Sequence, residues 1–189
     1  AGQLQAAAGK HEEALLQFEA LLGPTTAPQE RAQAMLSAGE SAAKLGKTEL
    51  AENYLNQVLT TIGLDPKFKA RAQIGLMEAR FQDGDHAAVL ALMDKGEFSG
   101  EDSIQAQVYM LAGRSLAKLG RHHEAPRYFF NVERLAPLSA LGFEASYRRL
   151  VSFYQVDNPN LATQCDGFER IYGEPFKDHQ WLHQAKLLK

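Results

Sequence analysis

The sequence predicts an all-α fold, an α-α superhelix of about five helical hairpins with a 37-residue period. A turn residue recurs at a constant spacing of 37 residues, at Gly9, Gly46, Asp83, Gly120 and Asp157. The fifth residue after each marker is alanine, namely Ala14, Ala51, Ala88, Ala125 and Ala162. Four residues further on, a large apolar side chain stands in every hairpin but the last: Phe18, Leu55, Leu92 and Phe129, then Asp166.

Glycine also recurs seven residues before the marker, at Gly2, Gly39 and Gly113, with Leu76 and Leu150 in the other two hairpins. Glycine inside a helix costs about 0.5–1 kcal/mol relative to alanine, so its repetition at one position indicates a packing role. The distance between two helix axes depends on the side chains at the contact. We therefore expect glycine of the first helix to face alanine of the second, and the large apolar residue to fill the gap toward the next hairpin.

The predicted elements form one array with six parts. They are hairpins at residues 1–22, 28–62, 67–94, 103–135 and 140–172, and a partial sixth repeat at 178–189. Because both ends of the chain fall inside a repeat, we expect residues 1–189 to be a fragment of a longer array.

Helix ends follow from proline, glycine and capping residues. Gly23-Pro24 ends the first hairpin, and the segment from Thr25 to Pro28 starts the next. Asp65-Pro66 and Asn158-Pro159 each read as an N-cap followed by the first helical residue.

Two further boundaries rest on proline and glycine in the second half of the chain. Pro126 is tolerated only in the first turn of a helix, so that helix is expected to begin at His122 or His123. The stretch from Gly96 to Asp102 reads as a loop and as the most mobile join between hairpins.

These residues resemble the tetratricopeptide repeat (TPR). The residues that match its pattern are Ala14 and Phe18; Ala38, Gly39, Ala42, Ala51 and Leu55; and Ala112, Gly113, Leu116, Gly120, Ala125, Phe129 and Pro137. The usual TPR period is about 34 residues, so this chain is longer by about three residues per repeat. The resemblance implies a right-handed TPR-like solenoid that binds proteins rather than catalysing a reaction. Pro137-Leu138-Ser139 also resembles bacterial cell-envelope TPR proteins, which favours a periplasmic or secreted bacterial location over a cytoplasmic one.

In TPR proteins the first helix of each hairpin lines a concave groove. The resemblance places these residues in it: Gln33, Glu40, Lys44, Gln73, Met77, Arg80, Gln107, Met110, Arg114, Lys118, Tyr147 and Tyr154, together with Leu36, Phe81, Val151 and Gln155. Such a mixture suits an extended peptide or a partner helix, with the tyrosines as anchors. The alternative is that about half of these side chains pack between hairpins. The paired lysine and asparagine with which some TPR domains hold chaperone tails are missing from this set.

Composition excludes several other classes of protein. The 20 basic and 23 acidic residues give a net charge of −3, which argues against a general nucleic-acid surface. There is no apolar run of about 18 residues, as a membrane-spanning helix requires.

Cys165 is the only cysteine, so an intrachain disulfide is excluded. It shares a helix face with Leu161, Phe168 and Tyr172, which predicts a buried thiol.

No residue set predicts catalysis, a metal or a cofactor. His179 and His183 have a spacing that suits zinc, but the sequence offers no third ligand and no glutamate beside the first histidine. His122 and His123 read as a polar helix start, because adjacent helical positions do not face each other. The run from Asp83 to Asp85 lacks the other ligands of a calcium loop.

The sequence therefore favours a non-catalytic protein–protein interaction scaffold that binds a peptide or helix in the concave groove. The alternative is self-assembly through the open repeat ends, or a spacer role in a larger bacterial envelope protein. The sequence does not identify the partner.

Overall fold

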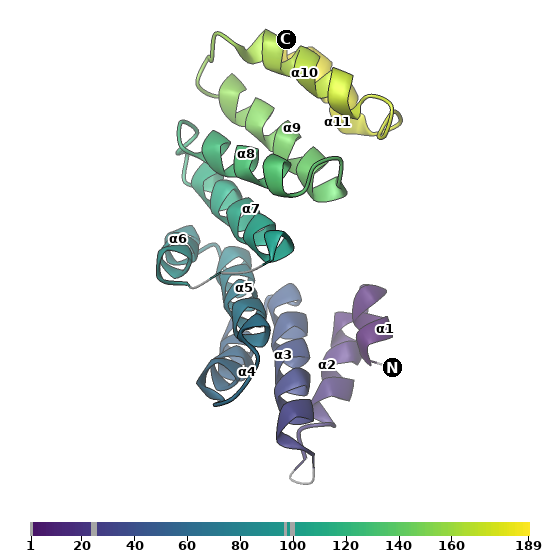
Figure 1. Cartoon of the computed structure of the whole chain (residues 1–189), viewed down its shortest axis with the longest axis vertical. Helices are drawn as coiled ribbons and strands as arrows, with labels where there is room; N and C mark the ends of the chain where they lie inside the picture. The colour runs from purple at the N-terminus through teal and green to yellow at the C-terminus, as the bar shows by residue number, and fades with distance from the viewer. Residues whose placement is uncertain (1, 24–25, 97, 99–100) are drawn as a thin grey trace. The chain divides into compact units, whose positions relative to one another are not determined.

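The computed structural model describes residues 2–23, 26–96, 98 and 101–189, which fold into eleven α-helices without a β-strand. The helices are α1 (Gly2–Ala7), α2 (His11–Glu19), α3 (Pro28–Lys44), α4 (Thr48–Thr60), α5 (Pro66–Gln82), α6 (His86–Lys95), α7 (Asp102–Lys118), α8 (Ala125–Leu135), α9 (Ala140–Tyr154), α10 (Leu161–Tyr172) and α11 (Gln180–Leu188). Consecutive helices joined by short turns pack side by side (Figure 1). The chain is an all-α solenoid, as the repeat predicts.

The helices form two compact units, residues 1–99 and 100–189. In the first unit α2 packs on α3, α3 on α4 and α5, and α5 on α6. In the second unit α8 lies against α7 and α9, and α9 against α10 and α11. Each helix thus contacts mainly its neighbours along the chain, as expected of a solenoid.

Each hairpin turn contains one residue with a left-handed backbone, which ends the first helix. These residues are Gly9 (φ 76°), Gly46 (φ 69°), Gly84 (φ 81°), Gly120 (φ 73°) and Asp157 (φ 49°). In each turn the next residue donates its backbone N–H to a carbonyl five residues earlier, for example Asp85 to Arg80 at 3.0 Å. This is the bonding of a Schellman helix end, which favours glycine at the left-handed position.

The prediction that Asp83 marks the third turn is therefore wrong. Asp83 keeps a right-handed backbone at φ −72°, and Gly84 takes the left-handed position. The physical reason is that glycine adopts positive φ without a steric penalty, whereas aspartate pays one. As a result, every position of the third hairpin lies one residue later than the constant spacing predicts.

This change of register explains the burial pattern of the third hairpin. Ala14, Ala51 and Ala125 are fully buried. In the third hairpin Val89 takes the buried place and Ala88 is only half-buried. In the fifth hairpin Ala162 is exposed, so the predicted contact of alanine with the first helix is wrong in both hairpins.

The recurring glycine of the first helices contacts the large apolar residue, not alanine alone. A Cβ added at Gly113 would lie 2.7 Å from Phe129, and one at Gly39 would lie 2.6 Å from Leu55. The large residue thus contacts the glycine of its own hairpin, whereas the expectation was that it fills the gap toward the next one. Leu55 reaches both, because a Cβ added at Gly75 of α5 would also approach it to 2.9 Å.

Several helix ends match the capping signals and two do not. Asp65 caps α5 by accepting the Lys67 N–H at 2.9 Å, as predicted. The helix α8 begins at Ala125, not at the histidines, because residues 121–124 form a hydrogen-bonded turn closed on the Arg121 carbonyl. The histidines therefore stand in that turn rather than at a helix start.

The last predicted cap is also shifted. The helix α10 begins at Leu161 rather than Pro159, because the Asn158 side chain accepts the Asn160 N–H at 2.9 Å and holds the preceding residues in a turn.

Parts of the predicted boundaries at Pro24 and Thr25, and of the predicted loop from Gly96 to Asp102, lie outside the described residues.

The core of the second unit confirms the face predicted around the single cysteine. Cys165, Phe168 and Tyr172 are buried, and Leu161 packs against them. Phe143 of α9 stacks on Phe168 at 5.3 Å between ring centroids. Burial raises the pKa of the Cys165 thiol.

Candidate functional site

Charged side chains link the first helices α3 and α5 of the first unit. Arg71 donates from Nε and Nη2 to the Glu40 carboxylate at 3.1 and 2.8 Å, and Lys44 pairs with Glu78 at 2.8 Å. Because α3 and α5 are first helices of neighbouring hairpins, these pairs lie along the face where the TPR resemblance places a groove. Two predicted groove residues, Glu40 and Lys44, therefore serve contacts between hairpins.

The electrostatic balance at Glu40 is set by burial. Burial raises the pKa of the Glu40 carboxyl above its ordinary value, while the Arg71 guanidinium acts in the opposite direction. The pair is half-exposed, and such pairs contribute little net stability. Its main effect is to fix how α3 and α5 meet.

Arg71 and Glu78 are the residues that the constant spacing missed. It assigned Gln73, Met77 and Arg80 to this face, but the turn at Gly84 moves the whole third hairpin by one residue. The signal was present in the sequence, since glycine next to Asp83 is the better left-handed residue.

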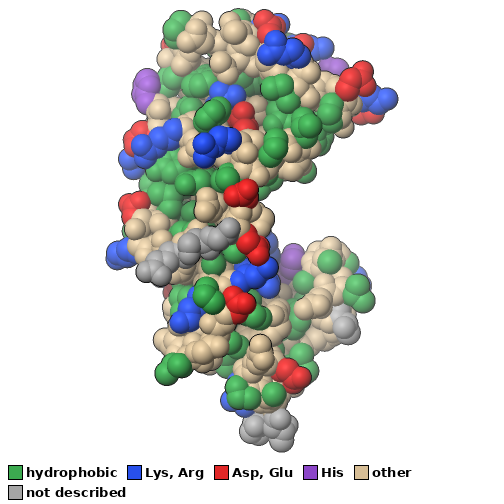
Figure 2. Space-filling view, in the orientation of Figure 1, with side chains coloured by type: hydrophobic (Ala, Val, Ile, Leu, Met, Phe, Trp, Pro, Cys, Tyr) green, Lys and Arg blue, Asp and Glu red, His purple; other side chains and the backbone are tan. Residues whose placement is uncertain are grey.

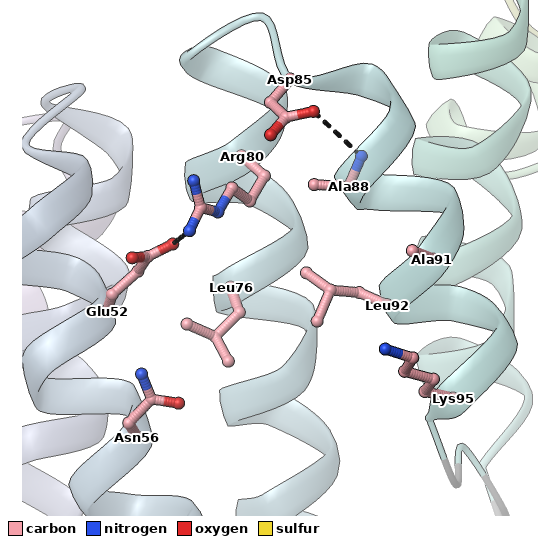
Figure 3. A pocket seen from close by; sticks show the side chains of 9 residues that line it. All are labelled: Glu52, Asn56, Leu76, Arg80, Asp85, Ala88, Ala91, Leu92 and Lys95. Carbon is pink, nitrogen blue, oxygen red and sulfur yellow. Dashed lines mark hydrogen bonds and ion pairs between the residues drawn. The ribbon is translucent and has the colours of Figure 1, made fainter.

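The other predicted residues of α5 lie elsewhere. Met77 is fully buried. Arg80 points toward α4, where it pairs with Glu52 at 2.5 Å (Figure 3). Gln73 is half-buried.

A hollow of about 640 Å³ lies beside the N-terminal part of α3. Its apolar lining consists of Gly2, Phe18, Leu21, Ala34 and Phe68, and its polar lining of Gln3, Thr26, Gln29, Glu30 and Gln33. These residues come from the first helices α1, α3 and α5, from α2, and from the segment between α2 and α3. Gln33 is the predicted groove residue that the structure places there.

A second hollow of about 380 Å³ lies between α4, α5 and α6 (Figure 3). Leu76, Ala88, Ala91 and Leu92 supply its apolar surface, and Glu52, Asn56, Arg80, Asp85 and Lys95 supply its polar surface. The Asp85 carboxylate accepts the Ala88 N–H at 3.0 Å and so caps α6. Because α4 and α6 are second helices, this hollow faces a different side of the first unit from the α3–α5 ion pairs.

In the second unit, α7 carries four predicted groove residues. Gln107 and Lys118 are exposed and Arg114 is half-buried, whereas Met110 is buried. Met77 and Met110 are both buried, which fits the alternative that some of the predicted groove residues pack between hairpins.

The two predicted tyrosine anchors of α9 differ in their surroundings. Tyr147 stacks on Trp181 of α11 at 5.0 Å and donates its hydroxyl to Gln184 at 2.7 Å. Burial raises the pKa of Tyr147. Tyr154 is half-exposed. Tyr147 therefore already holds α9 against α11, while Tyr154 presents a ring to solvent.

The two histidines weighed as zinc ligands have separate surroundings. His179 accepts the Trp181 N–H at its ring Nδ1 at 3.2 Å and so caps α11, whereas His183 is exposed. Across the described ranges, no three histidine, cysteine, aspartate or glutamate side chains are grouped as metal ligands would be.

Charge is dispersed over the surface. Figure 2 shows lysine and arginine side chains interspersed with aspartate and glutamate on the visible face of each unit. Among the described residues, no helix combines the length and apolar character needed to cross a bilayer.

Comparison with known proteins identifies the fold. The chain is similar to the solved structure named "MamA MSR-1 C2", a TPR-containing protein, with a TM-score of 0.56 and 16% sequence identity. The match covers 99% of this chain and 91% of that one. No protein-family model and no curated protein sequence matches the chain. The chain therefore has a TPR-like helical-repeat fold.

Proposed function

We propose that this chain is a non-catalytic protein–protein interaction scaffold that binds a peptide or a helix on the face formed by its first helices. The observation that carries the proposal is the hollow among α1, α2, α3 and α5. Its wall is apolar at Phe18 and Phe68, and its rim carries Gln29 and Gln33. Apolar surface supplies binding free energy, and a few polar groups at the rim orient the ligand.

The position of the hollow on a helical-repeat face favours a peptide segment over a small metabolite. At about 640 Å³ it accommodates one or two side chains, and the adjoining α3–α5 face continues it with paired charges. An amphipathic peptide would place an apolar side chain in the hollow and hydrogen-bond to the glutamines.

Site-specific photo-cross-linking tests this proposal. A photoreactive residue replaces Gln33 in one sample and the 96% exposed Ile62 in a control, and the cross-linked protein is identified by mass spectrometry. We expect the same partner to be captured from Gln33 and not from Ile62. Binding of the purified partner is then measured by calorimetry.

Two variants make the test quantitative. Phe68→Ala is expected to weaken binding by at least about tenfold, the size of effect seen at central interface residues, whereas Gln57→Ala on α4 leaves it unchanged. Capture from Ile62 alone, or equal affinity for both variants, would contradict the proposal.

The second candidate is self-assembly through the ends of the array. Leu4 of α1 is 77% exposed and Leu187 of α11 is 86% exposed, so each terminal helix presents a large apolar side chain. If this candidate holds, sedimentation shows a mass that rises with concentration, and Leu187→Glu abolishes the rise. A constant monomer mass excludes it.

A further inference from the structure

The hollow between α4, α5 and α6 lies where another hairpin of the same chain carries a tyrosine. Counted from the left-handed turn residue, Leu92 occupies the same position as Tyr54 in the second hairpin and Tyr128 in the fourth. By the same count, Asn56 on α4 corresponds to Glu19 on α2.

In the second hairpin the tyrosine joins two consecutive second helices. The Tyr54 hydroxyl of α4 donates to the Glu19 carboxylate of α2 at 2.9 Å, and its ring packs against the core of the first unit. Burial and the hydrogen bond to Glu19 raise the pKa of Tyr54. In the second hairpin, a phenol thus closes the space between two second helices.

In the third hairpin that phenol is missing. Leucine has neither the length nor the hydroxyl to reach Asn56, and the hollow of about 380 Å³ remains next to Leu92. Figure 3 shows Leu92 pointing from α6 toward Leu76, with Asn56 on the facing helix α4. Within the described residues, the side-chain amide of Asn56 makes no hydrogen bond, so it is free to accept one.

One cation at the rim, Lys95, is available to an acidic neighbour. Arg80 is paired with Glu52, and the Asp85 carboxylate accepts a backbone N–H. Lys95 is exposed and forms no ion pair within the described part of the chain. A carboxylate next to the bound ring would therefore meet one available cation, which adds affinity and orientation.

We propose that this hollow binds a tyrosine side chain of a protein partner, with an acidic residue beside it. The ring replaces the missing phenol against Leu76 and Leu92, its hydroxyl donates to the Asn56 amide oxygen, and the acidic side chain contacts Lys95. Ligand pockets span about 300–1,000 Å³, so the hollow fits one ring and not a whole helix. The proposal rests on the scaffold role but uses a face different from the one proposed above.

The probes are three short capped peptides, Tyr-Glu, Tyr-Gln and Ala-Glu, titrated into the ¹⁵N-labelled chain. Affinity for so small a ligand is expected in the millimolar range. We expect Tyr-Glu to shift the backbone amide signals of Ala88, Ala91 and Leu92 and the side-chain amide of Asn56. Ala-Glu should bind at least about fivefold more weakly, because aromatic area supplies most of the affinity.

Three variants complete the test. Leu92→Tyr restores the residue found in the second and fourth hairpins, and is expected to abolish the Tyr-Glu shifts and raise the melting temperature. Ala88→Leu narrows the hollow without a new polar group and is expected to have the same effect on binding. Lys95→Gln should remove the preference for Tyr-Glu over Tyr-Gln.

The proposal is overturned if Tyr-Glu causes no shift up to about 5 mM, if Ala-Glu shifts the same signals equally, or if Leu92→Tyr and Ala88→Leu both keep the wild-type response. Such a failure is distinct from failure of the scaffold proposal, since the cross-links from Gln33 do not depend on this hollow.

Discussion

At the scale of single residues, Arg149 and Glu133 form the most enclosed ion pair among the described residues. Their side chains are 16% and 15% exposed, and the guanidinium donates to both carboxylate oxygens at 2.7 and 3.0 Å. Burial raises the pKa of the Glu133 carboxyl, although Arg149 acts against this rise. Burial therefore disfavours the charged carboxylate, and Arg149 offsets part of this penalty.

Replacing Arg149 tests this balance. Arg149→Ala is expected to lower the free energy of unfolding by about 3 kcal/mol at neutral pH, as for other broken buried pairs. Without its partner, Glu133 has a folded-state pKa still further above the unfolded value. The folded state then binds more protons between these two values, so stability falls as pH rises through that window. The loss should therefore be smaller at about pH 5 than at about pH 7.5, as measured by urea denaturation.

Arg148 supplies the matched control. It pairs with Glu144 one helical turn away on a more exposed surface, so Arg148→Ala should cost only about 0.5 kcal/mol, with little change between the two pH values. Equal losses for the two variants would show that the burial of the Glu133 pair has no energetic consequence.

At the scale of elements, the turns decide where each hairpin begins. Gly84→Ala places a side chain at φ 81° and should cost about 1–2 kcal/mol. Asp83→Ala, at a right-handed and exposed position, should change the free energy of unfolding by less than about 0.5 kcal/mol. Thermal melts of both variants distinguish the two residues. A larger loss for Asp83→Ala than for Gly84→Ala would indicate that Asp83 sets the position of the third turn, as the constant 37-residue spacing predicts.

Helix contact can be tested in the same way within one unit. Gly113→Ala brings a Cβ to 2.7 Å from Phe129 and is expected to lower stability by about 1–2 kcal/mol. Gly167→Ala meets no atom within 4 Å, so helix propensity alone should raise stability by about 0.5–1 kcal/mol. Chemical denaturation measures both. If Gly113→Ala were also stabilising, glycine would have no packing role in the repeat.

At the scale of the whole molecule, contacts run mainly between neighbouring helices, which makes stability local. Phe143 is 2% exposed and stacks on Phe176 at 4.1 Å in the core of the second unit. Phe143→Ala should therefore destabilise that unit by about 3–5 kcal/mol.

Native-state hydrogen exchange measures how far this effect spreads. We expect faster exchange of amides in α9, α10 and α11, and unchanged exchange in α2, α3 and α4. Leu36→Ala, at a fully buried position of the first unit, is the reciprocal control. Acceleration of every helix by either variant would mean that the chain unfolds as one cooperative unit.

Much of the fold follows from local sequence. Glycine at a helix end, aspartate before proline, and apolar residues at helical spacing act within a few residues of one another. They predict the all-α solenoid, the Asp65 cap and the buried face around Cys165. Their physical basis is the backbone freedom of glycine and the burial of one helix stripe.

Other features required the packed structure. The pairing of Arg71 with Glu40 and of Glu78 with Lys44 appears only when α3 and α5 are packed together. The turn before Leu161 likewise depends on the Asn158 side chain, which competes with helical bonding. The repeat pattern does not give the volume or the lining of either hollow, since both depend on how several helices meet. Local propensity thus determined that these helices exist, whereas only contacts between helices decided which side chains they bury and which they present to a partner.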